Sequence, residues 1–294
     1  MVRPHHFTVN DETAADNHFQ VSTNSVGDLS PLAYAEITRA AGLLKEQGIT
    51  VHLFESEDND APDAVFPNNW FSTHAGGYVA IYPMKASSRR RERRSDVISM
   101  LKSRYRVQQV IDYSGLESDK LFLEGTGSMV LDHIDRVAYA VRSVRTDPIA
   151  LERFCTQFSF EPMVFAAKDP RGFDIYHTNV LMCVATDFAM IGLEMITDSG
   201  IRREIVRRLE RTGRQVIGLT NAQIEKFAGN AIELLGGNGR ILALSMTALL
   251  ALTTDQIDII SASARPVPLA IPTVERAGGS VRCTIAGIHL TPRA

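Results

Sequence analysis

The sequence predicts an α/β protein with the architecture of a fivefold pseudo-symmetric β/α propeller, formed by a single domain that spans residues 1–294. Three observations support this fold class. Short strand-like runs alternate with helical segments, as they do in α/β proteins. A polar residue recurs before an apolar run at a nearly constant spacing, which indicates a structural repeat. The last repeat is incomplete, and the parts that it lacks occur near the N-terminus.

Helices are predicted from their start signals. A Ser, Thr or Asp side chain before a proline or an apolar stripe accepts hydrogen bonds from the first free N–H groups of a helix. Such signals occur at Ser30-Pro31, Asp147-Pro148, Asp198 and Thr253, the last with Gln256 as a capping box. Gly48 and Gly213 follow two of these segments and predict where the helices end.

Strands are predicted where β-branched and aromatic residues cluster between turn signals. These runs are Val51–Phe54, Val79–Tyr82, Val107–Ile111, Val180–Val184, Val216–Leu219, Ile241–Leu244 and Pro266–Ile271. Turn residues join some of them into hairpins, at Gly76-Gly77, Asp135-Arg136 and Gly236–Gly239. The repeating unit is therefore a hairpin, a helix and a single strand.

The repeat is clearest in five polar residues, each placed just before an apolar run: Asn69, Glu124, His177, Asn230 and Cys283. Their separations are 55, 53, 53 and 53 residues. We expect each to open the first strand of a module and to face a common axis, so that all five side chains meet. The fifth module has a strand at Ile285–Leu290 and is completed by the strand near Val2, the helix from Pro31 and the strand at Val51.

Two of these positions predict covalent chemistry. A free cysteine is commonly a buried structural residue, and a lone histidine is commonly a hydrogen-bonded one. Their places in the repeat favour function instead, with Cys283 as nucleophile and His177 as general acid/base. Arg282 favours the Cys283 thiolate if its side chain points inward. Glu124 either orients His177 or binds a substrate nitrogen.

Composition excludes several classes of protein. The chain has 31 Lys and Arg against 34 Asp and Glu, so bulk charge predicts neither a nucleic-acid partner nor a membrane surface. No apolar run reaches the roughly 20 residues of a membrane helix, and residues 1–10 lack signal-peptide features. Cys155, Cys183 and Cys283 are scattered without a CxxC pair. We therefore expect free thiols, no structural metal site and a cytoplasmic location.

Four segments, in this order and spacing, resemble a known superfamily: Asp63–Asn69, Leu123–Gly125, His177–Asn179 and Arg282-Cys283. It is the guanidine-modifying superfamily, which contains arginine deiminases, dimethylarginine hydrolases, amidinotransferases, succinylarginine dihydrolases and citrulline-utilising hydrolases. The resemblance spans nearly the whole chain. It implies the five-bladed propeller of the pentein fold and a catalytic set of Cys, His and an acid that uses no metal or cofactor.

Two departures from the superfamily pattern concern the substrate. Arginine deiminases carry aspartate where this chain has Asn69 and Asn179, and those carboxylates clamp a guanidinium cation. An amide both donates and accepts, so it suits a neutral ureido group. The string Asn68-Asn69-Trp70 resembles the citrulline-utilising branch, although succinylarginine dihydrolases also carry asparagine at the first position. Asp63 stays acidic, either to bind a substrate nitrogen or as a turn residue.

Arginines predict how the substrate carboxylate is held. Arg145 matches a superfamily arginine that binds the α-carboxylate. In the basic run Arg89–Arg94, Arg89 or Arg90 resembles a second arginine of this kind. The other interpretation of the run is a solvated helix face.

The sequence thus predicts hydrolysis of citrulline to ornithine, carbon dioxide and ammonia, with either ammonia or ornithine leaving first. The alternatives are a deiminase or dihydrolase of arginine or N-acylarginine, and a non-catalytic propeller that only binds. The expected partner is a small amino-acid substrate, and a homodimer is one candidate assembly.

Overall fold

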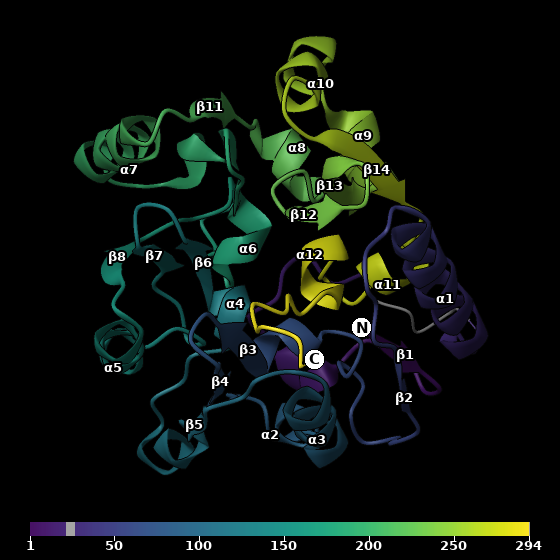
Figure 1. Ribbon diagram of the computed structural model, residues 1–294. Coiled ribbons are helices and arrows are strands. Elements are labelled where there is room, and N and C mark those ends of the chain that lie inside the picture. The colour runs from purple at the N-terminus through teal and green to yellow at the C-terminus, as the bar shows by residue number, and fades with distance from the viewer. Residues whose placement is uncertain (22–26, 294) are drawn as a thin grey trace.

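The computed structural model describes residues 1–21 and 27–293. Within this part of the chain the strands form five small sheets, four of three strands and one of two. Figure 1 shows the sheets around a centre, where the one-turn helices α4 (Gly125–Ser128), α6 (Thr178–Leu181) and α12 (Val281–Thr284) lie. The longer helices lie at the periphery. The predicted mixed α/β class is confirmed, and five small sheets fit the predicted repeat.

The four three-stranded sheets share one connection. In each, an antiparallel hairpin is followed by a helix and then by a third strand parallel to the second. Their strands are β3 (Phe71–His74), β4 (Tyr78–Ile81), β5 (Gln109–Asp112), β6 (Met129–Asp132), β7 (Val137–Val141), β8 (Glu161–Phe165), β9 (Met182–Val184), β10 (Phe188–Ile191), β11 (Gln215–Gly218), β12 (Ile232–Gly236), β13 (Gly239–Ser245) and β14 (Arg265–Leu269). The predicted unit of hairpin, helix and single strand is therefore present four times.

The helices of these units are α3 (Ser95–Arg104), α5 (Pro148–Phe158), α7 (Ser199–Arg211), and the pair α9 (Met246–Ala251) and α10 (Thr254–Ser261). α5, α7 and α10 begin at the predicted signals, whereas α3 begins without a side-chain cap. The Asp147 and Asp198 side chains accept hydrogen bonds from backbone N–H groups of the first turn of α5 and α7. Thr253 and Gln256 form the predicted capping box of α10. Each cap satisfies donors that the helix itself leaves free.

The two-stranded sheet comes from the N-terminal part of the chain. β1 (Val2–Pro4) and β2 (Phe54–Ser56) pair in parallel, and α1 (Ser30–Glu46) lies between them in sequence. The predicted cap of α1 is wrong, because Ser30 belongs to the helix and its hydroxyl accepts a hydrogen bond from the N–H of Phe7 at 2.9 Å. A backbone donor far along the chain thus takes the oxygen that a cap would use.

Two strand predictions also need correction. Ile285–Leu290 forms no strand, since the Thr73 hydroxyl donates to Gly287 O at 3.0 Å and accepts from the His289 N–H at 2.7 Å. The backbone groups of this segment therefore form hydrogen bonds with a side chain of β3 and not with a neighbouring strand. In the run from Val51, only Phe54 joins a strand, because the ladder with β1 covers Phe54–Ser56.

The predicted strand-opening residues mostly precede a helical turn. Glu124 comes before α4, His177 before α6, and Cys283 lies within α12, while Asn69 ends the 3₁₀ turn η2 (Pro67–Asn69). A short apolar run is compatible with a buried helical turn as well as with a strand, so periodicity alone does not separate the two. α4 packs against both η2 and α6, which brings neighbouring modules into contact at the centre.

The hydrophobic core lies between each helix and its sheet and continues into the neighbouring module. Leu151 and Phe154 of α5 pack with Ala140 of β7. Ile37 of α1 packs with Val267 of β14, which joins the N-terminal helix to the last three-stranded sheet. The remaining short helices are α2 (Ser87–Arg90), α8 (Asn221–Glu225), α11 (Pro272–Glu275), η1 (Asp11–Thr13), η3 (Ser114–Asp119) and η4 (Leu193–Met195). Across the described residues, every helix is too short or too polar to cross a membrane.

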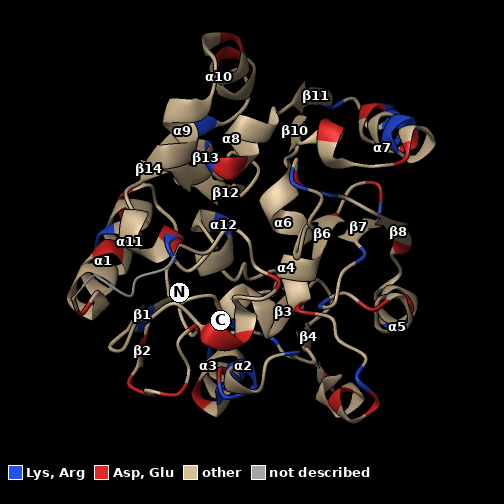
Figure 2. Ribbon diagram, turned by 180° about the vertical axis from the view of Figure 1, so that it is seen from behind, with Lys and Arg blue, Asp and Glu red and all other residues tan. Residues whose placement is uncertain are grey.

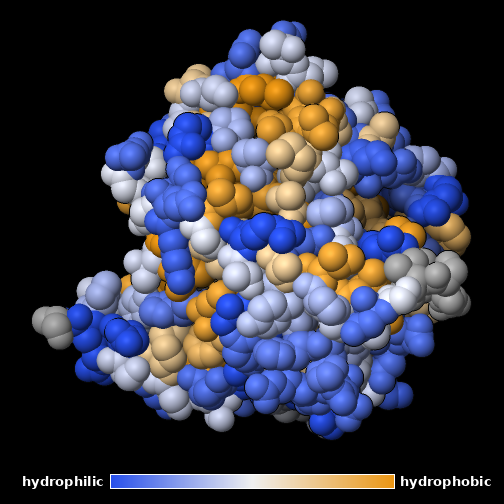
Figure 3. Space-filling model, turned by 90° about the vertical axis from the view of Figure 1, so that its right-hand side faces the viewer, coloured by the Kyte–Doolittle hydropathy of each residue, from blue (hydrophilic) through white to orange (hydrophobic). Residues whose placement is uncertain are grey.

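The charged residues lie mainly at the periphery. Figure 2 shows acidic and basic residues interspersed along α7, whereas the central helices α4 and α6 are largely uncharged. On the side that carries α1, hydrophobic surface occurs as several patches between hydrophilic residues (Figure 3). The expected homodimer stays a prediction.

Candidate active site

A narrow cavity at the centre gathers most of the predicted site residues. It is lined by Asn17, Asp63, Phe66, Asn69, Arg89, Arg145, Tyr176, His177, Ala277, Gly279 and Cys283. Its volume is about 10 Å³, which is about the space that one water molecule needs. The structure therefore brings residues from distant modules together, around a cavity that must open to admit any ligand larger than water.

Cys283 lies in α12 at the wall of this cavity and is 2% exposed. Its sulfur accepts hydrogen bonds from Asn179 Nδ2 and Asn230 Nδ2, both at 3.3 Å. Two amide donors stabilise negative charge on the sulfur. A side chain at position 279 would lie 3.0 Å from the Phe66 ring, so glycine at this position lets the backbone pack closely against Phe66 beside Cys283.

His177 is paired with Glu124 behind the cavity. His177 Nε2 lies 2.9 Å from Glu124 Oε2, and both side chains are almost completely buried. Burial lowers the pKa of His177 to about 4, and the nearby Glu124 carboxylate offsets this only in part. A neutral imidazole that donates through Nε2 carries its lone pair on Nδ1. It is therefore in the state that a general base requires.

Glu124 is also the centre of a buried charge cluster. Arg89 donates to Glu124 Oε2 at 2.9 Å, and an Arg145 nitrogen lies 3.6 Å from the same oxygen. Burial raises the pKa of Glu124, but these two guanidinium groups and His177 outweigh it and hold the pKa well below its usual range. Arg89 is paired in addition with Glu92 at 2.7 Å. The negative charge of Glu124 is thus matched inside the protein.

The remaining polar groups of the cavity are an amide and a carboxylate. In the orientation that satisfies both ends of its amide, Asn69 accepts from Arg89 at 2.8 Å and donates to Asn68 Oδ1 at 3.3 Å. Asp63 Oδ2 accepts from Asn10 Nδ2 at 2.8 Å and lies 3.6 Å from Arg89. Its other oxygen, Oδ1, is buried and has no hydrogen-bond partner among the described residues. That oxygen is available to a donor on a ligand.

The guanidinium of Arg145 binds a carboxylate of the N-terminal segment. Its Nε donates to Asp16 Oδ1 at 3.1 Å, and Lys85 Nζ lies 2.6 Å from the other Asp16 oxygen. Burial raises the pKa of Asp16, yet the bonds from Arg145 and Lys85 outweigh it and lower that pKa overall. Asn17 of the same segment lines the cavity and donates to Ala277 O at 3.3 Å. A protein carboxylate thus takes the place where the resemblance puts the substrate carboxylate.

Two arginines do not lie where the sequence suggested. Arg90 does not line the cavity, because its guanidinium donates to Met84 O at 3.1 Å and pairs with Glu117 at 3.3 Å. Its neighbour Arg89 does line the cavity, so of the two arginines that the sequence suggested, Arg89 is the one at the site. Arg282 lines a different cavity and donates to Ile285 O at 3.0 Å, so it does not point inward to the thiol.

Several residues at the site are not predicted by the sequence patterns. The 53-residue repeat predicts that Asn230 reaches the centre but not that its amide donates to the Cys283 sulfur. Glu92 lies within the basic run and carries a pKa that burial raises to about 8. Asp16 and Asn17 carried no signal in the sequence, since only the folded chain brings them to the cavity. Among residues 1–21 and 27–293, no cluster of three or more His, Cys, Asp or Glu side chains is arranged to hold a metal ion.

Comparison with solved structures gives related folds at low sequence identity. ArgZ, an arginine dihydrolase from the ornithine-ammonia cycle in Cyanobacteria, aligns with a TM-score of 0.75 and 17% identity over 97% of this chain and 39% of that chain. Its N-terminal domain, bound to substrate, aligns with a TM-score of 0.70 and 16% identity over 96% of this chain and 95% of that domain. A dimethylarginine dimethylaminohydrolase adduct with S-methyl-L-thiocitrulline gives 0.64 and 12% identity over 96% of each chain.

The chain spans 39% of the length of full-length ArgZ and corresponds to its N-terminal domain. No curated protein sequence matches it. A family model does match, over residues 3–290, and its description is N,N dimethylarginine dimethylhydrolase, eukaryotic. The chain therefore belongs to the N,N-dimethylarginine dimethylhydrolase family, within the guanidine-modifying superfamily of pentein-fold enzymes.

Proposed function

We propose that this chain is a single five-module β/α propeller that hydrolyses the ureido group of citrulline, to give ornithine, carbon dioxide and ammonia. Cys283 is the nucleophile, and His177 is the general acid and base. The observation that carries the proposal is the neutral surrounding of the nucleophile. Its sulfur contacts two amides, and the one carboxylate beside His177 is already matched by two guanidinium groups.

The reaction divides into two steps. His177 takes the proton of the Cys283 thiol, and the resulting thiolate attacks the ureido carbon. A C–N bond of the tetrahedral intermediate then breaks as His177 delivers that proton to the departing amine. His177, neutral again, then takes a proton from water, which attacks the thio-linked carbon, and it returns that proton to the Cys283 thiolate that leaves. The product of this step is a carbamic acid, whose remaining C–N bond breaks as it loses carbon dioxide, so that ornithine, ammonia and carbon dioxide are formed in total. Glu124 holds the imidazole by accepting from Nε2, and it stabilises the imidazolium that exists whenever His177 has taken up a proton.

The polar groups around the nucleophile favour a substrate whose reacting group is neutral. A guanidinium is best held by carboxylates, each charge-assisted hydrogen bond being worth about 1.5–3 kcal/mol. Asn69 and Asn179 supply amides instead, and Glu124 is already bonded to Arg89 and His177. A ureido oxygen needs donors, which amide N–H groups provide and carboxylates do not.

The other end of citrulline carries the α-carboxylate and the α-ammonium group of an amino acid. Arg145 suits the α-carboxylate, because it is buried and now binds a carboxylate of the protein, Asp16. Asp63 suits the α-ammonium, since Oδ1 has no hydrogen-bond partner within the described chain. Entry of citrulline then requires Asp16 to leave Arg145, and with it the segment around Asn17 that narrows the cavity.

A second candidate is hydrolysis of arginine. It is favoured by Asp63, a 3% exposed carboxylate that lines the cavity, and by the likeness to ArgZ, which is an arginine dihydrolase. In this alternative, Asp63 and Glu124 hold the guanidinium in spite of the two asparagines.

Ammonia release from citrulline, arginine and N-succinylarginine, each with a Cys283→Ala control, tests both candidates. The proposal expects kcat/KM to be highest with citrulline and the control to be inactive with every substrate. A preference for arginine would favour the second candidate. If no substrate is turned over but citrulline still binds, the chain is a binding protein and not an enzyme.

A further inference from the structure

A second cavity, of about 130 Å³, lies on the other side of the central polar residues. Its walls are formed by residues that follow the five positions of the 53-residue repeat along the chain. They include His74, Thr126, Cys183 and Glu233. It shares no lining residue with the candidate active site. α12 separates the two, with Cys283 facing one cavity and Arg282 the other.

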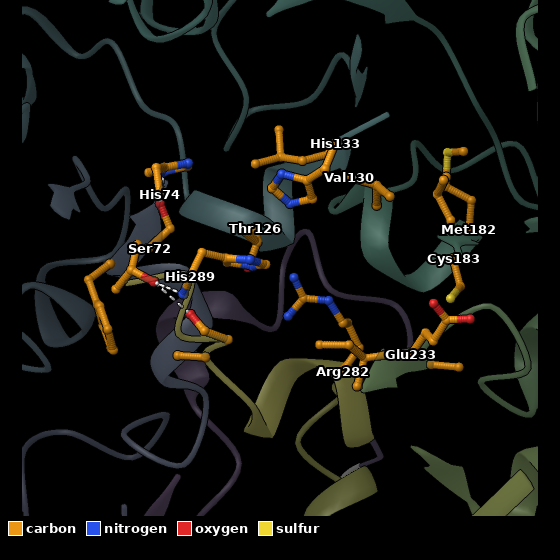
Figure 4. A pocket seen from close by; sticks show the side chains of 18 residues that line it. Ser72, His74, Thr126, Val130, His133, Met182, Cys183, Glu233, Arg282 and His289 are labelled. Atoms are coloured by element: carbon orange, nitrogen blue, oxygen red, sulfur yellow. Dashed lines mark hydrogen bonds between the residues drawn. The ribbon is translucent and has the colours of Figure 1, made fainter. Parts of the chain in front are cut away.

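Arg282 is a cation without a matching acid. Figure 4 shows its guanidinium pointing into the middle of the cavity, between His289 and His133 on one side and Glu233 on the other. One nitrogen donates to Ile285 O at 3.0 Å. Within the described chain Arg282 has no Asp or Glu in ion-pair range, and burial lowers its pKa. Such a charge is costly to hold inside a protein unless an anion compensates it.

Imidazoles surround the guanidinium. His133 and His289 are exposed, and their ring centroids lie 4.6 Å apart. His74 is buried in the wall, where its Nε2 lies 2.6 Å from Ser72 Oγ, and burial lowers its pKa to about 3. Burial lowers the pKa of His133 to about 4 and also lowers the pKa of His289, so both rings are neutral near pH 7. An anion that binds beside them favours their protonated forms, which add N–H donors and positive charge near Arg282.

Few acidic groups compensate the positive charge of Arg282 and the protonated histidines. Asp132, beside His133 in sequence, is bonded to Arg214 at 2.7 Å. Glu233 lines the cavity, and one of its oxygens accepts from the Thr186 N–H at 3.2 Å. Arg136 faces the same three histidines from an adjoining cavity, stacked over Phe160. When the two exposed histidines are protonated, positive charge exceeds the single carboxylate of Glu233.

We infer that this cavity binds a phosphate group, held by the Arg282 guanidinium and by His133 and His289. A guanidinium fork matches the oxygens of phosphate, and a histidine that binds an anion takes up a proton. The bound anion supplies the counter-charge that the described chain does not provide for Arg282.

Isothermal titration calorimetry with inorganic phosphate tests the site, on protein whose Cys283 has been alkylated so that the candidate active site is blocked. Arg282→Met should weaken binding about tenfold or more, the loss of one or two charge-assisted hydrogen bonds. Arg207→Met is the matched control, because Arg207 is exposed on α7 and should leave the affinity unchanged. Thermal unfolding verifies that each variant is folded.

Sulfate serves as a second ion, because its charge is constant between about pH 5 and about pH 8, a range that extends below the pKa of free histidine toward the lowered pKa values of His133 and His289. Sulfate should bind more tightly at the lower pH, and His289→Gln should remove part of that dependence. Glycerol phosphate then tells a site for phosphate esters from one for the free ion alone. The inference is overturned if wild-type protein binds neither anion at millimolar concentration, or if Arg282→Met and His289→Gln both bind as the wild type does.

Discussion

His177 Nε2 contacts Glu124 Oε2 at 2.9 Å, and the two residues open neighbouring modules that lie 53 positions apart in the chain. The contact fixes which ring nitrogen carries the proton. It also joins the imidazole to a carboxylate that Arg89 and Arg145 keep ionised. The pair therefore behaves as one buried unit, with a neutral imidazole and a charged carboxylate.

Stability should depend on pH through His177. Its pKa is lowered to about 4, below the ordinary value of 6.5, so between these values the unfolded chain binds a proton that the folded chain does not. The free energy of unfolding should therefore fall as pH drops from about 6.5 to 4, by about 3 kcal/mol from this residue. Urea unfolding of wild type and His177→Gln over this range measures the difference. His6→Gln, at an exposed position, should follow the wild type. Equal slopes for wild type and His177→Gln would contradict the prediction.

Iodoacetamide should label Cys283 before the other cysteines. Burial raises the pKa of Cys155 and of Cys183 to about 12, so neither forms the reactive thiolate near neutral pH. Cys283 instead accepts two amide hydrogen bonds at the wall of the cavity. Peptide mass spectrometry after brief alkylation reports the order of labelling. Cys155→Ala and Cys183→Ala should keep turnover, and loss of turnover only in one of these two variants would rule out the assigned nucleophile.

Asn69→Asp should weaken citrulline turnover. The new carboxylate would pair with Arg89 and would lie near Asp63 and Glu124, where like charges repel. It also no longer donates to a ureido oxygen. The loss of one such hydrogen bond and the added repulsion should lower kcat/KM about tenfold or more. Steady-state assays on citrulline and arginine measure the change. An unchanged or higher value with citrulline would show that Asn69 does not contact the ureido group.

Asp16→Asn should lower KM for the substrate. The Asp16 carboxylate occupies Arg145 in the closed form, so an amide, which binds a guanidinium less strongly, should be displaced more easily. The expected change is a several-fold lower KM with little effect on kcat, because Asp16 does not line the cavity. Glu12→Gln is the matched control, since Glu12 lies in the same segment but contacts Ser87 and Ser88. A higher KM in Asp16→Asn would mean that Asp16 helps to hold the substrate.

Gly127→Ala should damage the site without a change in its chemistry. A methyl group at this position would lie 2.2 Å from the Asn69 amide and 2.7 Å from the His177 ring, so both side chains would have to move. We expect a fall in kcat of about 10² or more, because small displacements of catalytic groups are costly. Gly115→Ala is the control, since nothing lies within 4 Å of the added atom. Wild-type kcat in both variants would argue against this arrangement of His177.

The sequence by itself determined features whose cause is local or repeated. Asp147, Asp198 and Thr253 cap the helices that follow them, because the hydrogen bonds involved reach only two or three residues along the chain. The regular spacing of Asn69, His177 and Cys283 likewise predicted that these residues meet, since equal modules place equal positions around a common centre.

Only the tertiary structure decided which neighbours each side chain meets. Arg89 and Arg90 are adjacent on α2, yet one joins Glu124 and the other Glu117. Asp16 reaches Arg145 across 129 positions of sequence, and Thr73 holds the segment that was expected to form the last strand. Charges and backbone groups far apart in sequence pair according to how the modules pack, and that packing energy is not contained in any single segment.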